Sequence, residues 1–106
     1  MSKLLKNTFK AVLNEMPPGP PRLTVTGKVE VPTLGWSGTL VRAVPQGINP
    51  EILLLDVKLK EPSGGSGDRV SEVDLTYQES PPQGKYSQVT ARLDGDAVTV
   101  GVQRVS

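Results

Sequence analysis

The stretch Val89-Thr-Ala-Arg-Leu-Asp-Gly-Asp-Ala-Val-Thr-Val100 determines the fold class expected of this chain. The Asp94-Gly95 pair at its centre predicts a two-residue type I′ turn, because both positions tolerate positive φ. With that turn Ala91 lies opposite Val98, and the apolar side chains of both arms share one face. A shift of one residue in the register would mix apolar and polar side chains on that face. The stretch is therefore predicted to form a β-hairpin.

Four segments before the hairpin also have the residue pattern of β-strands. In residues 23–31 apolar and polar residues alternate strictly, which is typical of a half-buried strand. Residues 36–44, 51–60 and 69–78 follow the same pattern and are separated by segments rich in proline and glycine. Strands without intervening helices predict an all-β domain over residues 22–106. We expect an antiparallel six- to seven-stranded sandwich, immunoglobulin-like in architecture, or a small barrel.

The N-terminal segment, residues 1–16, has a different apolar spacing. Its apolar residues recur at intervals of three and four, with lysines between them, which predicts a short amphipathic helix or a disordered segment. Such a helix would dock on the domain or, through Leu5 and Phe9, contact a membrane surface or a partner's groove. Residues 17–21, Pro-Pro-Gly-Pro-Pro, are predicted to be an extended proline-rich linker.

The composition excludes most catalytic chemistry. The 106 residues contain no histidine and no cysteine, so a thiolate nucleophile, an imidazole base and the usual zinc ligands are all absent. We therefore expect no enzyme activity and no cofactor; an Asp/Glu-dependent hydrolase is the alternative from the enzyme class. A net charge of +1 and only four aromatic residues argue against nucleic-acid binding.

Loop positions give the candidate contact residues. In an antiparallel succession the loops near Leu34, near Gly65 and at residues 94–95 share one end of the domain, and the loops near Ile48 and Pro82 share the other. Ile48 is interpreted first as a plug folded under its loop and second as an exposed contact. The same alternatives apply to two further residues, Leu34 and Trp36, and burial is favoured for the tryptophan.

Carboxylates in the loops define a candidate calcium site. Asp68, Asp94 and Asp96 share one end with Glu61, and oxygen ligands are those that calcium prefers. Solvated loop acids are the favoured explanation of these residues, since Asp94-Gly95-Asp96 has the chemistry of a hairpin turn. We therefore predict no metal and keep a calcium-dependent binding domain as an alternative function.

These observations predict a non-catalytic binding or assembly module with an unidentified protein partner. It would act through its loops, an exposed sheet edge or the N-terminal segment. Open sandwiches leave edge strands that pair with other chains, so a homodimer is a further expectation. The sequence as given has no pattern of a signal peptide or a transmembrane segment, and it does not indicate a compartment.

Overall fold

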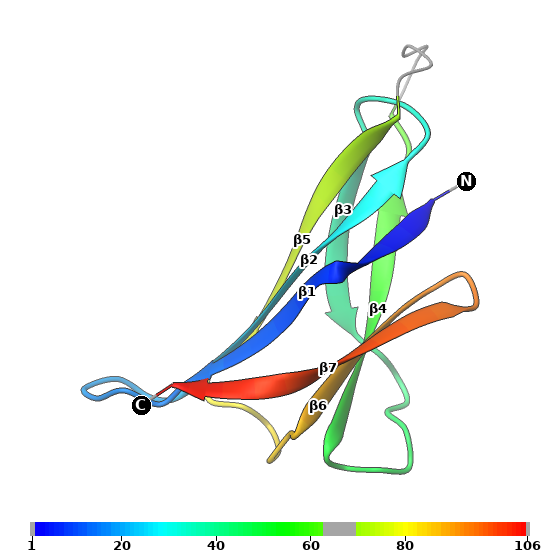
Figure 1. Cartoon of the computed structure of the whole chain (residues 1–106). Coiled ribbons are helices and arrows are strands. Elements are labelled where there is room, and N and C mark those ends of the chain that lie inside the picture. Colours follow the sequence, from blue (N-terminus) through cyan, green and yellow to red (C-terminus); the bar gives the residue numbers. More distant parts are fainter. Residues whose placement is uncertain (1, 63–69, 106) are drawn as a thin grey trace.

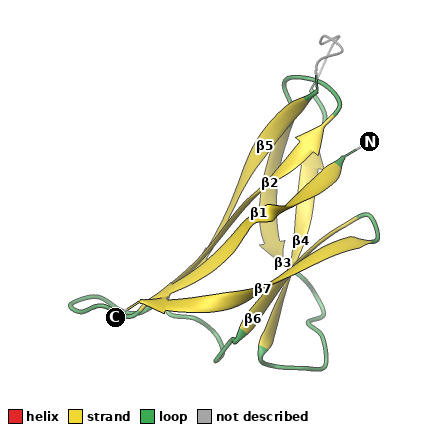
Figure 2. Ribbon diagram, viewed as in Figure 1, coloured by secondary structure: helices red, strands yellow, loops and turns green. Residues whose placement is uncertain are grey.

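The computed structural model describes residues 2–62 and 70–105, which form seven strands and no helix (Figures 1 and 2). The strands are β1 (Lys3–Asn14), β2 (Arg22–Val31), β3 (Ser37–Arg42), β4 (Ile52–Lys60), β5 (Ser71–Glu79), β6 (Gln88–Leu93) and β7 (Asp96–Val105). The all-β prediction is confirmed. The helix predicted over residues 1–16 is wrong, because its described part is mostly β1.

The strands form one sheet that is nearly closed into a barrel. Their order is β3-β4-β6-β7-β1-β2-β5, and the two outer strands, β3 and β5, lie next to each other. Most neighbours are antiparallel, but β1 with β7 and β4 with β6 are parallel pairs. The barrel-like closure agrees with the second of the two expected architectures, and the sandwich is not confirmed.

The hairpin of β6 and β7 has the predicted register. Ala91 pairs with Val98 and Val89 with Val100. The φ angles are 48° at Asp94 and 83° at Gly95, as a type I′ turn requires. The pattern of residues 89–100 thus predicted both the turn and the face that the side chains occupy.

Most of the core consists of the inward-facing residues of the predicted alternating strands, and β1 adds Leu4, Phe9 and Ala11. In β2 the apolar residues of the alternating pattern are all buried, namely Leu23, Val25, Val29 and Val31. In β4 the inward series of Leu53, Leu55 and Val57 is buried, and Leu59 packs against the core. The central strands are therefore held by apolar burial, the largest favourable contribution to folding.

The N-terminal strand is irregular, and this irregularity explains the failed helix prediction. Its pairing with β2 is interrupted between Leu5 and Lys10, where residues 6–9 lie opposite the single residue Gly27. Leu4 faces inward before the interruption, Phe9 faces inward within it, and Ala11 faces inward after it. Because the extra residues change which positions face the core, the apolar spacing resembles that of a helix.

A side-chain hydroxyl stabilises the interruption. Thr8 Oγ1 donates a hydrogen bond to the Leu5 carbonyl (2.6 Å) and accepts one from the Lys28 N–H (2.9 Å). The hydroxyl thus takes the place of a backbone group in the ladder. The proline-rich residues 17–21 lie in the connection between β1 and β2, and these two strands pair with each other in one sheet.

Candidate interaction surface

The segment Ala43-Val-Pro-Gln-Gly-Ile-Asn-Pro50, here called the apolar loop, connects β3 to β4 at the lower end of the molecule in Figure 1. It contains no charged residue. Val44 is 91% exposed and Ile48 is fully exposed, at 104%. The interpretation of Ile48 as a buried plug is therefore wrong. The side chains of Val44 and Ile48 are both exposed to solvent on the same loop.

The Gln46 side chain anchors the first half of the apolar loop. Its Nε2 donates hydrogen bonds to the carbonyls of Ala43 (2.7 Å) and Leu54 (2.9 Å), and its Oε1 accepts one from the Leu54 N–H (2.9 Å). The side-chain amide thus pairs with β4 as a backbone peptide group would. The Ala43 N–H donates to the same Leu54 carbonyl at 3.0 Å.

Asn49 anchors the second half of the apolar loop. Its Oδ1 accepts a hydrogen bond from the Glu51 N–H (2.9 Å), and its carbonyl accepts one from the Ile52 N–H (3.2 Å). An Asn side chain bonded to the backbone two residues later is the Asx-turn arrangement. Both ends of the loop are therefore tied to β4, while Val44 and Ile48 make their side chains available to solvent.

A buried carboxylate fixes the base of the apolar loop. Glu79, at the end of β5, is only 7% exposed. Its Oε2 accepts hydrogen bonds from Arg42 Nη1 (2.8 Å) and Tyr77 Oη (2.7 Å), and its Oε1 accepts from the Gln83 N–H (2.9 Å) and Tyr86 Oη (3.3 Å). Arg42 also donates to Tyr86 Oη at 2.7 Å. Because Arg42 directly precedes the loop, this cluster fixes where the loop begins.

The protonation of the cluster favours a structural role. Burial by itself would raise the pKa of Glu79, but the hydrogen bonds from Gln83 and Tyr77 and the charge of Arg42 together hold that pKa below its ordinary value. Burial, and then the hydrogen bond to Glu79, raises the pKa of Tyr77 to about 12. An acid/base catalyst works best with a pKa near the working pH, and neither group meets that condition near neutrality.

One cavity beside the cluster is small. The cavity next to Tyr86 has a volume of about 10 Å³ and is lined by Leu13, Leu23, Pro82, Gly84, Tyr86 and Val102. Small-molecule sites usually enclose roughly 300 Å³ or more. Sequence reasoning overlooked Glu79 because it ended the strand at residue 78. Continuing the inward series of Val73, Leu75 and Tyr77 by two residues would have found the carboxylate.

A second surface feature, here called the Trp36 trough, lies at the other end of β4. It consists of two adjoining depressions of about 440 and 490 Å³, both lined by Val57, Lys58, Leu93 and Asp94. The trough opens where the pairing of β4 with β6 ends, at Asp56 opposite Arg92. It brings residues of the β2–β3 connection and of the β6–β7 turn to one end, as the loop positions predicted.

Trp36 lines this trough and is partly buried, so the expectation of burial is met only in part. Its ring packs against the core, and its Nε1 donates a hydrogen bond to Thr33 Oγ1 at 2.8 Å. The neighbouring Leu34 is 44% exposed. Trp36 therefore belongs both to the edge of the core and to the accessible surface.

The N-terminal contact candidates have different surroundings from those expected. Phe9 is buried, and its ring covers Gly27, where an added Cβ would lie 2.4 Å from the ring. Leu5 is partly buried in β1 next to the interruption. The amphipathic helix that would have presented both residues to a membrane or a groove does not form. No helix long and apolar enough to cross a membrane occurs in residues 2–62 or 70–105.

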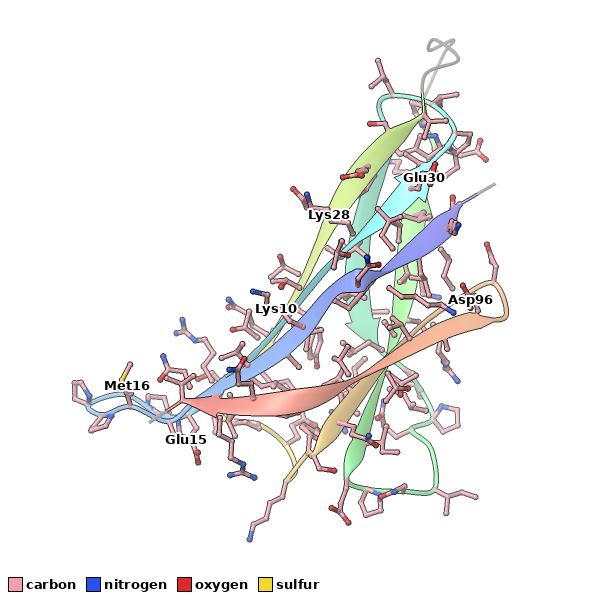
Figure 3. All side chains as sticks on the ribbon, viewed as in Figure 1. Lys10, Glu15, Met16, Lys28, Glu30 and Asp96 are labelled. Carbon is pink, nitrogen blue, oxygen red and sulfur yellow. The ribbon has the colours of Figure 1, made fainter. Side chains whose placement is uncertain are left out.

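The calcium candidates are distributed as follows. Asp94 and Asp96 lie in or beside the β6–β7 turn, and Figure 3 shows Asp96 at this tip. The Asp96 carboxylate forms an ion pair with Lys6 Nζ (3.1 Å) and accepts a hydrogen bond from the Ala97 N–H (2.9 Å), and these contacts lower its pKa. Asp68 lies outside the described residues. Within the described residues no three His, Cys, Asp or Glu side chains are grouped so as to hold a metal ion.

Comparisons with known proteins found no match to this chain, neither a protein-family model nor a curated protein nor a solved structure. The functional argument accordingly rests on the apolar loop, the Glu79 cluster beneath it and the Trp36 trough.

Proposed function

We propose that this protein is a non-catalytic binding module whose contact surface is the apolar loop, with Val44 and Ile48 as the anchoring side chains. The observation that carries the proposal is the full exposure of Ile48 on a loop whose backbone is held by side-chain hydrogen bonds. Single exposed aliphatic residues are common on protein surfaces. Two of them on one uncharged loop form a more specific feature, typical of a surface that another molecule covers.

The anchoring of the loop supports this function energetically. Association is opposed by the entropy lost when loops and side chains become ordered at an interface. Here Gln46 and Asn49 already fix the loop against β4, and the ion pair of Arg42 with Glu79 fixes its beginning. A partner would therefore meet a preorganised surface and would have little ordering left to supply.

Chemical cross-linking of the folded protein in the cells that produce it tests the proposal. Cross-linked partners are quantified for the wild type, for Ile48→Asp and for Met16→Asp. Met16 is 49% exposed and lies in the β1–β2 connection, far from the apolar loop in Figure 3, so it is a matched control. We expect at least one partner that is lost with Ile48→Asp and retained with Met16→Asp.

Both substitutions are at exposed positions, so the free energy of unfolding should change by no more than about 0.5 kcal/mol. If the two variants are equally stable, the loss of a partner with Ile48→Asp results from the changed loop surface and not from unfolding. An identical set of partners for the wild type and Ile48→Asp would refute the proposal.

A further inference from the structure

We infer that this barrel opens at the contact between β3 and β5, and that the ion pair of Arg42 with Glu79 is an acid-sensitive latch on that contact. The inference goes beyond the proposed function, since it concerns a movement of the fold. Among the described residues no backbone ladder joins β3 to β5, whereas every other pair of neighbouring strands has one. The contact of Ser37–Arg42 with Ser71–Glu79, here called the seam, is therefore held by side chains.

The first part of the seam is an apolar contact. A Cβ built at Gly38 in β3 would lie 3.0 Å from the Leu75 side chain and 3.1 Å from that of Val73, both in β5. Glycine itself brings no side chain to this contact, and Val73 is only partly buried. Separating β3 from β5 here breaks no ladder of backbone hydrogen bonds, so the seam is the place where the sheet opens with the fewest lost interactions.

The Glu79 carboxylate fastens the other part of the seam. Arg42, the last residue of β3, donates from Nη1 to Glu79 Oε2 at 2.8 Å, and within the described part of the chain this is the one ion pair between the two strands. The charged and titratable groups that contact Glu79 are Arg42, Tyr77 and Tyr86, and the Gln83 N–H also donates to it. Protonation of Glu79 would turn one of the two accepting oxygens into a donor.

Acid should therefore release the latch. Burial alone would raise the pKa of Glu79, but the hydrogen bonds from Gln83 and Tyr77 and the charge of Arg42 hold that pKa below its ordinary value of 4.5. The contribution of the latch is thus complete above the ordinary pKa and is lost as the pH falls through the lowered one. Because Arg42 directly precedes the apolar loop, opening of the seam also releases the beginning of that loop.

An introduced thiol measures the opening. The chain has no cysteine, so Leu75→Cys places a single thiol in the seam, and Ala91→Cys places one at an equally buried position of β6, between β4 and β7. A reagent in solution reaches a buried thiol only when the site opens, so the rate relative to free cysteine reports the opening. Val73→Cys, which removes less of the core, is a second reporter. Each is measured with Glu79 intact, with Glu79→Gln and with Glu72→Gln, the exposed control on β5.

At neutral pH Glu79→Gln should accelerate modification at position 75 by about tenfold or more. Glutamine resembles the protonated acid in shape and removes the charge that Arg42 binds. At position 91 the change should be much smaller, and Glu72→Gln should change neither rate. Equal acceleration at positions 75 and 91 would overturn the inference, because it would mean that the whole barrel unfolds. An unchanged rate at position 75 would overturn it as well.

A pH series with Glu79 intact gives a second test, which does not require the Glu79→Gln variant to fold. As the pH falls below about 4.5, the relative rate at position 75 should rise by a similar factor while position 91 stays protected. A rate at position 75 that is independent of pH would show that Glu79 is not the latch, and so would the same pH dependence in Glu79→Gln. Either result leaves the proposed function intact, because that function rests on the exposure of Ile48 and is tested by cross-linking.

Discussion

At the scale of single residues, Glu79 is notable because its charged side chain is buried. Its carboxylate receives hydrogen bonds from the side chains of Arg42, Tyr77 and Tyr86 and from the backbone of Gln83. A buried charge destabilises a fold unless it is paired and hydrogen-bonded, and here both conditions are met. The residue therefore joins the ends of β3 and β5 to the segment before β6.

Replacing Glu79 by alanine should destabilise the protein substantially. The change leaves Arg42 without its counterion and two tyrosine hydroxyls without an acceptor, at a cost on the order of 3 kcal/mol. Urea unfolding followed by circular dichroism measures the difference. Glu72→Ala, at an exposed position of the same strand, should change the free energy of unfolding by less than about 0.5 kcal/mol. Equal effects of the two substitutions would contradict the assigned role.

The pKa of Tyr77 predicts a loss of stability in alkali. Its value is raised from 10.0 to about 12 in the folded protein, so the folded state retains a proton that the unfolded state has released. The resulting stabilisation is complete below pH 10 and disappears as the pH rises through 12. Absorbance of the phenolate should show a late-titrating component from Tyr77 in the wild type. That late phase should be absent from Tyr77→Phe, and its persistence there would show that the assignment is wrong.

At the scale of elements, β1 shows how a long strand accommodates extra residues. Its pairing with β2 is interrupted opposite Gly27, and Phe9 places its ring over that glycine. The absence of a side chain at position 27 gives the ring its place in the core, while Thr8 satisfies the Lys28 N–H. The interruption is thus stabilised by three side-chain features close together in the fold.

Gly27→Ala should destabilise the protein through the Phe9 ring. The added Cβ would lie 2.4 Å from the ring, which therefore has to move, at a cost of roughly 1–3 kcal/mol. A double-mutant cycle with Phe9→Ala measures the coupling. In the Phe9→Ala background the same Gly27→Ala change should cost close to nothing. A full cost in both backgrounds would mean that the ring does not determine the need for glycine.

At the scale of the whole molecule, two different contacts close the sheet. Strand β1 joins β2 on one side to β7 on the other, through the parallel pairs from Ala11–Val102 to Asn14–Val105. The outer strands β3 and β5 meet through side chains, since a Cβ at Gly38 would lie about 3 Å from Leu75 and Val73. The Glu79 cluster then fastens β3 to β5 at the lower end.

Deleting residues 2–14 should abolish cooperative unfolding, because β1 provides the connection between β2 and β7. A separate peptide of residues 2–14 should restore the transition by re-forming both ladders, and a peptide with the same residues in scrambled order should not. Calorimetry in the presence of each peptide measures this. A docked or free N-terminal helix would instead predict that the shortened chain keeps its melting transition.

Part of this architecture follows from local pattern. The strict alternation in residues 23–31 and the Asp94-Gly95 turn predicted two strands and one hairpin with the observed faces and register. The anchored apolar loop was predicted only as a loop containing Ile48. Its exposure depends on Gln46 and Asn49 bonding to β4, and such contacts between a side chain and a distant backbone have no local signature.

The sequence by itself determined that the domain is all-β, where most strands lie and which of their faces are apolar, because alternation and turn chemistry are properties of neighbouring residues. Only the tertiary structure decided that residues 3–14 form a strand and that β4 and β7 each have a parallel neighbour. It also brought Arg42 to Glu79 and left Ile48 in solvent. These features arise from pairing between distant segments, and the free energy of that pairing depends on which strand edges the rest of the fold makes available.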